Sequence, residues 1–172
     1  MPAFSYAQAA VLAVLVAVAA VYDVRERRIP NWLCLAGFAA AFAVNLGWDL
    51  ARGAGLALSV YLALFLIRAM GGGDLKLMVA AGALAGPSRW LLIFCLASIL
   101  GGIVALAMIA MRRRLPGTLE NIVVILGRLA RGRAPHEGRP DLDVRTGAGL
   151  RLPHGVPIAV GTWLALAAAG VR

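Results

Sequence analysis

The sequence predicts an all-α, polytopic membrane protein with about six transmembrane helices and one amphipathic helix at the membrane surface. Apolar residues make up 62% of the 172 positions, charged residues only 15%, and the mean hydropathy is +0.85. The apolar runs are unbroken and rich in Ala, Leu and Gly, whereas the strands of a membrane barrel alternate apolar and polar residues. A spanning helix needs roughly 20 residues, so residues 1–172 are predicted to form a single integral-membrane domain.

Apolar runs, separated by polar or glycine-rich residues, define the predicted spans. Pro30 suits the first turn of the second run, because the N–H that proline lacks would be unpaired there. Short links at Asp49–Gly53 and Gly71–Gly73 separate the second, third and fourth runs. The six predicted spans are Ala3–Tyr22, Pro30–Trp48, Ala54–Met70, Leu75–Gly86, Trp90–Met111 and Gly155–Val171.

Residues 112–152 are predicted to form a cytoplasmic amphipathic helix and a loop. Arg112–Arg114, followed by Pro116 and Gly117, mark the end of the fifth span. From Leu119 onward, apolar residues recur at helical spacing with polar residues elsewhere on the wheel, which predicts a helix on the membrane surface. Residues 132–151 mix Pro, Gly and both charge signs, which is typical of a polar loop.

The charge distribution predicts the orientation of the spans. The 17 Lys and Arg residues exceed the 8 Asp and Glu residues, giving a net charge of +9. Membrane topology explains this excess without a nucleic-acid partner, because only Arg52, Arg89 and Arg172 fall in predicted outside segments. Both termini are therefore expected outside and the basic segments in the cytoplasm. The first run is not expected to be a secretory signal, because no basic residue precedes it.

The two cysteines, Cys34 and Cys95, lie inside apolar runs with no CxxC spacing. They are expected to be small core residues. The sequence therefore predicts no zinc site, no disulfide framework and no cofactor.

Asp23 and Asp74 are the acidic residues that most need an explanation, because each adjoins an apolar run. In the six-span topology Asp23 ends the first span and Asp74 opens the fourth, so both are expected near the cytoplasmic face. One interpretation makes each a helix-end carboxylate, with Asp74 favoured by the helix dipole and Asp23 balancing the adjacent arginines. The other interpretation is a facing pair.

Two facing carboxylates cannot both ionise easily, so their pKa values split and one stays protonated near neutral pH. The ionised member then draws a proton from water, while the neutral member hydrogen-bonds the peptide carbonyl, as in aspartic proteolysis. Glycines just before Asp74 let a substrate strand approach the carboxylate, although simple helix termination explains them equally well.

Three segments resemble motifs of the type IV prepilin peptidases. The stretch Gly-Gly-Gly-Asp-Leu-Lys-Leu at 71–77 resembles their GxGD motif. The stretch Asp-Val-Arg-Glu-Arg-Arg-Ile-Pro-Asn at 23–31 resembles their other aspartate motif, in which an Asp precedes Arg-x-Ile-Pro-Asn. Residues 152–159 are similar to the late Pro-Tyr-Gly segment, with His154 where tyrosine is usual. The resemblance covers nearly the whole chain, in order.

The resemblance implies an intramembrane aspartic endopeptidase of the cytoplasmic (inner) membrane. Asp23 and Asp74 match the catalytic pair, and the implied substrate is a membrane-anchored pilin-like precursor with a short basic leader. Larger relatives carry a Cys-rich zinc motif and methylate the new amino terminus, so this chain, without cysteine pairs, is expected to cleave without N-methylation. Its small size is most similar to Flp/Tad-type prepilin peptidases or archaeal preflagellin peptidases. Presenilin-like proteases are longer and carry a Pro-Ala-Leu motif that is absent here.

Other residues match the family positions but have plain alternative roles. Lys76 either tunes the charge of Asp74 or holds substrate, or it is an ordinary positive-inside lysine. Asn31 is either a site residue or a helix cap. The remaining predicted binding or site-shaping residues are Gly71, Gly73, Arg28, Pro30, Pro153 and Gly155.

A non-catalytic membrane protein of the same fold is the alternative hypothesis. It is either a small proton-coupled transporter, whose intramembrane acids carry protons, or a pilus assembly factor. Proton-carrying acids are expected near mid-span, whereas both aspartates are predicted at the cytoplasmic side beside glycines, which favours the enzyme. The sequence specifies no oligomeric state.

Overall fold

The computed structural model describes residues 4–45, 47–67, 70–111, 115–132 and 154–171. Over these residues the regular structure is helical, apart from one isolated parallel bridge between Phe4 and Val171. The prediction of an all-α chain is therefore confirmed. The seven helices are α1 (Tyr6–Glu26), α2 (Asn31–Val44), α3 (Trp48–Leu66), α4 (Gly72–Ala85), α5 (Pro87–Met111), α6 (Leu115–Leu129) and α7 (Gly155–Ala169).

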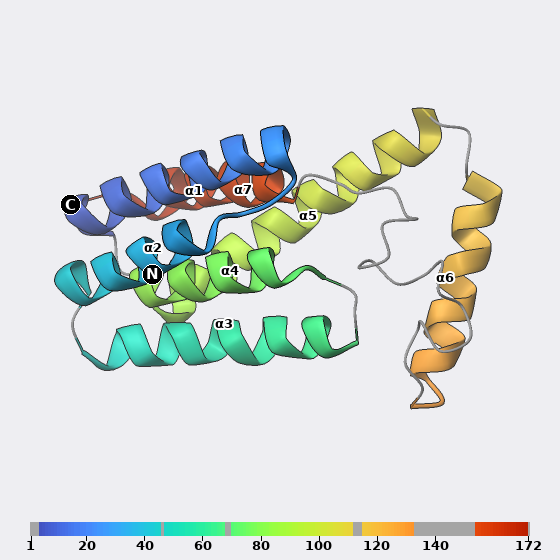
Figure 1. Cartoon of the computed structure of the whole chain (residues 1–172), viewed down its shortest axis with the longest axis horizontal. Helices are drawn as coiled ribbons and strands as arrows, with labels where there is room; N and C mark the ends of the chain where they lie inside the picture. Colours follow the sequence, from blue (N-terminus) through green and yellow to red (C-terminus); the bar gives the residue numbers. More distant parts are fainter. Residues whose placement is uncertain (1–3, 46, 68–69, 112–114, 133–153, 172) are drawn as a thin grey trace.

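Six of the helices form a bundle, and α6 lies across one end of it (Figure 1). Helices α3 and α4 pack closely as a hairpin, and α7 packs between α1 and α5. Helix α5 contributes only its first half to the core, where Trp90, Ile93 and Ala97 are buried, whereas Leu106 and Met111 near its end are exposed. In α6 the apolar side chains of Ile122, Val123 and Leu126 are exposed, which fits the amphipathic pattern of its sequence.

Three helices, α1, α3 and α5, are long and apolar enough to cross a membrane alone. Helices α2 and α7 are apolar but contain 14 and 15 residues, and α4 contains 14. A 14-residue helix rises about 21 Å, which is shorter than the hydrocarbon core of roughly 30 Å. The six-span topology thus stays a prediction, as does the placement of α6 on the membrane surface.

The link predicted at Asp49–Gly53 is wrong, because α2 ends at Val44 and α3 already begins at Trp48. Gly47 precedes α3 with φ at 121°, a conformation that favours glycine. Asp49 lies in the first turn of α3, where the helix dipole favours a carboxylate. The Asn45 side-chain amide donates a 2.6 Å hydrogen bond to the carbonyl oxygen of Ala83, which ties this turn to α4.

Glycines allow the helices to approach closely. A side chain at Gly53 would collide with the backbone of Gly82, and one at Gly82 would collide with Gly53, so α3 and α4 touch through their main chains. On the other side of the bundle, a Cβ at Gly161 of α7 would lie 2.7 Å from the backbone nitrogen of Ala97 in α5. Small residues at helix contacts are the usual means of tight packing in membrane proteins.

An aromatic cluster joins α3 to α5 inside the bundle. Tyr61 meets Trp90 and Phe94 edge to face, and these two rings stack on each other. The Trp90 indole N–H donates a 3.1 Å hydrogen bond to the carbonyl oxygen of Met78 in α4. The cluster therefore fixes α3, α4 and α5 relative to one another.

Candidate active site

Three segments that are distant in sequence meet at one end of the bundle. The carboxyl end of α1 and the amino ends of α4 and α7 lie at this end (Figure 1). The first turn of a helix presents unpaired N–H groups and the positive end of the helix dipole. Two such helix starts thus adjoin the last turn of α1, which is a favourable environment for carboxylates.

Asp23 points into the bundle from the last turn of α1. Its side chain is buried, with 9% of its surface exposed. The backbone N–H of Gly155, the first residue of α7, donates a 2.6 Å hydrogen bond to Oδ2 of Asp23. One of the unpaired amides at the start of α7 is therefore satisfied by this carboxylate.

Gly155 leaves no room for a side chain at this contact. A Cβ there would lie 2.9 Å from Cβ and 3.0 Å from Oδ2 of Asp23, and 3.2 Å from Cα of Ala20. These distances are at or below the lower limit of normal packing contacts. The lack of a side chain on Gly155 therefore allows α7 to approach α1 this closely.

Asp74 is the third residue of α4, and its side chain is half-buried. It is close enough to Asp23 and His154 to interact electrostatically with both. Its carboxylate lies beside Gly71, where an added Cβ would be 3.7 Å from Oδ2. The structure thus brings the two sequence-predicted aspartates together, from helices that begin 66 positions apart at Tyr6 and Gly72.

The GxGD segment packs against the Ile-Pro-Asn segment. A Cβ at Gly73 would lie 3.3 Å from Cβ of Ile29, so these two residues are in tight contact. The Lys76 ammonium donates a 2.8 Å hydrogen bond to Oδ1 of Asn31. The two predicted motifs are therefore in direct contact, and this contact holds the start of α4 beside the end of α1.

The turn between α1 and α2 creates that contact. Arg27 ends α1 in the left-handed conformation, with φ at 52°, and its N–H donates to the carbonyl oxygen of Asp23. Pro30 is extended and precedes the first residue of α2, one position earlier than the predicted first turn. Asn31 opens α2 without capping it, because no side-chain cap hydrogen bond is formed there.

The structure does not join every predicted residue to the aspartates. Arg28 is exposed in the turn, and within the part of the chain that the structure describes no hydrogen bond joins it to either carboxylate. Pro153 lies outside the described residues. No three His, Cys, Asp or Glu side chains gather as a possible metal site within the part of the chain that the structure describes.

Sequence reasoning gave no role in the site to three residues that lie here. Ile29 is buried against Gly73. Tyr61 of α3 is 3% exposed and lies close enough to Asp74 to interact with it electrostatically. His154 precedes the amide that binds Asp23. Ile29 and His154 both lie inside segments that resemble family motifs, at 23–31 and 152–159, whereas Tyr61 lies in an apolar run that resembles ordinary core.

Fold and site together define a helical membrane protein that holds two acidic side chains close together at one end of its bundle. Residues 10–106 match the model of the type IV leader peptidase family, which is more than half of the 172-residue chain. The chain belongs to this family. The matched region contains both aspartates and ends before Gly155. No curated protein and no solved structure gave a significant match.

Proposed function

We propose that this protein is an aspartic endopeptidase that removes the basic leader from Flp-type pilin precursors at the cytoplasmic face of the inner membrane. The observation that carries the proposal is the convergence of Asp23 and Asp74 at one end of the bundle, where Asp23 is buried against the start of α7. Family membership supports the peptidase activity in general.

In this proposal the two carboxylates share one proton and titrate as a unit. The ionised carboxylate accepts a proton from the attacking water, and the protonated carboxylate donates to the carbonyl oxygen of the scissile peptide. The water oxygen forms the new bond to the carbonyl carbon and gives a tetrahedral intermediate. The peptide C–N bond then breaks as the leaving nitrogen takes the proton that the first carboxylate accepted from water, and the C=O bond re-forms as the hydroxyl proton returns to the second carboxylate. The hydrogen bond from Gly155 holds one carboxylate in a fixed orientation for these steps.

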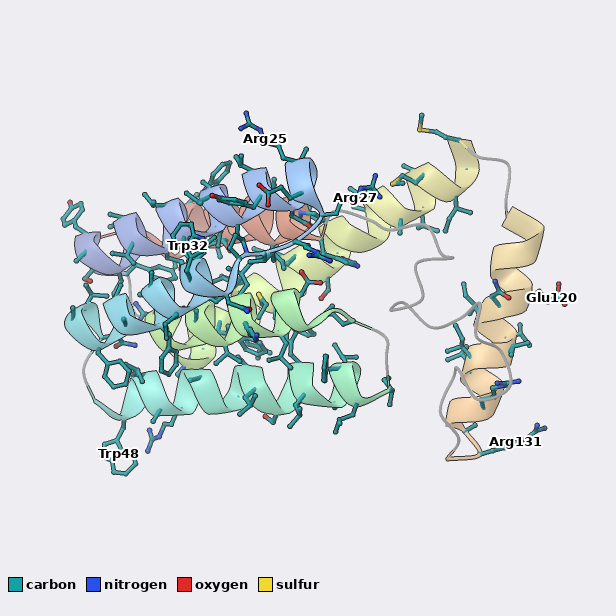
Figure 2. The ribbon with its side chains drawn as sticks, viewed as in Figure 1. Arg25, Arg27, Trp32, Trp48, Glu120 and Arg131 are labelled. Atoms are coloured by element: carbon teal, nitrogen blue, oxygen red, sulfur yellow. The ribbon has the colours of Figure 1, made fainter. Side chains whose placement is uncertain are left out.

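The distribution of charge supports a cytoplasmic site. Basic residues gather at the end of the bundle where the aspartates lie, and Arg25 points away from the helices there (Figure 2). Trp48 points outward at the opposite end (Figure 2), which suits a residue of the membrane interface. The lack of cysteine pairs in the sequence supports cleavage without N-methylation.

A co-expression assay tests the proposal. A pilin precursor with a basic leader ending in Gly is expressed with the wild type, Asp23→Asn or Asp74→Asn, and its size is followed by immunoblot. The wild type is expected to shorten the precursor, and each variant is expected to leave it intact while remaining in the membrane fraction.

Asp49→Asn is the matched control, because it makes the same Asp-to-Asn change in α3 at the far end of the bundle. This variant is expected to cleave the precursor like the wild type. Normal processing by either Asp23→Asn or Asp74→Asn would refute the catalytic pair. If both variants also support pilus assembly, the non-catalytic alternative replaces the enzyme, and solute movement in liposomes is measured next.

A further inference from the structure

His154 lies beside both members of the aspartate pair. It directly precedes Gly155, whose amide is 2.6 Å from Asp23, and it forms the amino-terminal cap position of α7. Its side chain is half-buried and interacts electrostatically with Asp74. The mechanism proposed above gives this imidazole no role, although it directly precedes the residue of α7 that binds Asp23.

We infer that His154 is a positioning residue that sets the charge state of the aspartate pair and extends cleavage into acidic conditions. The inference rests on the proposed function. Histidine ordinarily gains its positive charge near pH 6.5, within the range in which a carboxylate pair changes its shared proton. A cation beside the pair favours the state in which one carboxylate remains ionised.

Among the residues that the structure describes, the two aspartates are the acidic neighbours of His154. Helix α7 carries no titratable side chain, and α5 carries only Cys95 and, at the far end of the bundle, Arg89. Helix α4 contributes Asp74 and also Lys76, whose ammonium is hydrogen-bonded to Asn31.

The carboxyl end of α1 contributes Asp23, and the residues that follow it, Arg25, Glu26 and Arg27, are exposed to solvent. In α3, Tyr61 is buried near Asp74 and is neutral in this pH range. His154 is thus the described imidazole near the pair, and imidazole is the side chain that ordinarily changes its charge between about pH 5 and 8.

The sign of the effect follows from electrostatics. Cleavage fails at low pH, when both carboxylates are protonated. A charged imidazole opposes the second protonation, so the acid limb of the activity profile lies at lower pH than it would without the imidazole. At high pH the imidazole is neutral, so its charge does not affect loss of the shared proton on the alkaline limb. The influence of His154 is therefore confined to one side of the pH profile.

The test compares the pH dependence of kcat/KM for precursor cleavage by the purified full-length wild type, His154→Gln and His154→Lys. His154→Gln removes the charge, and its acid limb is expected to move to higher pH by about half a unit or more. His154→Lys keeps a permanent charge, so its acid limb is expected to remain at low pH while its alkaline limb also moves down. His136→Gln, which changes the other histidine of the sequence, is the matched control and should retain the wild-type profile.

An unchanged profile for His154→Gln, or an equal loss at every pH, would overturn the inference, because a purely structural role lowers activity without moving one limb. A second measurement does not require cleavage. The imidazole titration of His154 is followed by NMR in wild type and in Asp74→Asn, and its midpoint is expected at lower pH in the variant, because linkage is reciprocal. If the wild type cleaves no precursor but the titration midpoint of His154 differs between wild type and Asp74→Asn, the proposed function fails while the coupling between His154 and Asp74 stands. An identical midpoint in the two proteins would refute that coupling.

Discussion

The backbone amide of Gly155 binds Oδ2 of Asp23 at 2.6 Å, across 132 positions of the sequence. This contact makes the amino terminus of α7 a part of the candidate site. The family match stops at residue 106, so the match alone does not include this part of the site. The hydrogen bond fixes the carboxylate, and the absence of a side chain on Gly155 sets the distance between the helices.

Gly155→Ala is expected to lower kcat/KM by about tenfold to a hundredfold, because a shift of the order of 1 Å in a catalytic group has an effect of this size. The added methyl group would lie 2.9 Å from Cβ of Asp23, so either the carboxylate or the start of α7 must move. Initial rates of precursor cleavage by purified protein measure the effect.

Gly102→Ala is the matched control for this substitution. Gly102 lies within α5 and has no atom within 4 Å of an added Cβ, so the variant should cleave at the wild-type rate. Equal activity of Gly155→Ala and wild type would show that Asp23 tolerates displacement, and the contact would then have no role in catalysis.

The glycines before Asp74 are predicted to differ in their tolerance of alanine. A Cβ at Gly73 would lie 3.3 Å from Cβ of Ile29, close to the backbone of the turn, whereas one at Gly72 would lie 3.4 Å from the far edge of the Phe65 ring. Gly73→Ala is therefore expected to reduce cleavage several-fold. Gly72→Ala is expected to retain it and to stabilise the helix slightly, because alanine is the better helix former.

The same cleavage assay, with melting temperatures in detergent, separates the two glycine variants. Loss of activity in Gly72→Ala together with full activity in Gly73→Ala would contradict the packing that the structure gives to the GxGD segment.

The fold class and the two aspartates were predictable from sequence because both depend on local signals. Long apolar runs predict helices wherever they occur, and an aspartate between glycines and an apolar run stands out at its own position. The structure confirms the all-helical fold and brings Asp23 and Asp74 close together, whereas their catalytic role remains a prediction.

The remaining features depend on tertiary contacts, which periodicity does not encode. Asp49 is predicted in a link, but it lies in the first turn of α3, where the helix dipole favours a carboxylate. Asn31 was considered as a cap, yet its side chain accepts a hydrogen bond from Lys76 of another helix. Ile29 lies inside the segment that resembles the first aspartate motif, but only the packing of α4 shows that it supports Gly73.

Gly82→Leu is expected to destabilise the protein by about 1–3 kcal/mol or more, because overpacking a close helix contact forces the backbones apart. Gly82 in α4 faces the main chain of Gly53 in α3, and no side chain in either position can turn away from the opposing backbone. Thermal unfolding in detergent measures the loss. Gly55→Ala, on the open side of α3, is the control and should unfold like the wild type.

The hydrogen bond between Lys76 and Asn31 predicts an energetic coupling between the two aspartate motifs. Lys76→Met and Asn31→Ala are each expected to lower kcat/KM by about two- to fivefold, since the bond is exposed and its net contribution is modest. Each variant removes the same 2.8 Å contact between α4 and α2, so the double variant should lose little more than the more severe single variant. Rates for all four proteins complete the cycle. If the loss of kcat/KM in the double variant equals the product of the two single losses, Lys76 and Asn31 act independently. Lys76 would then be assigned to substrate binding or to membrane topology instead.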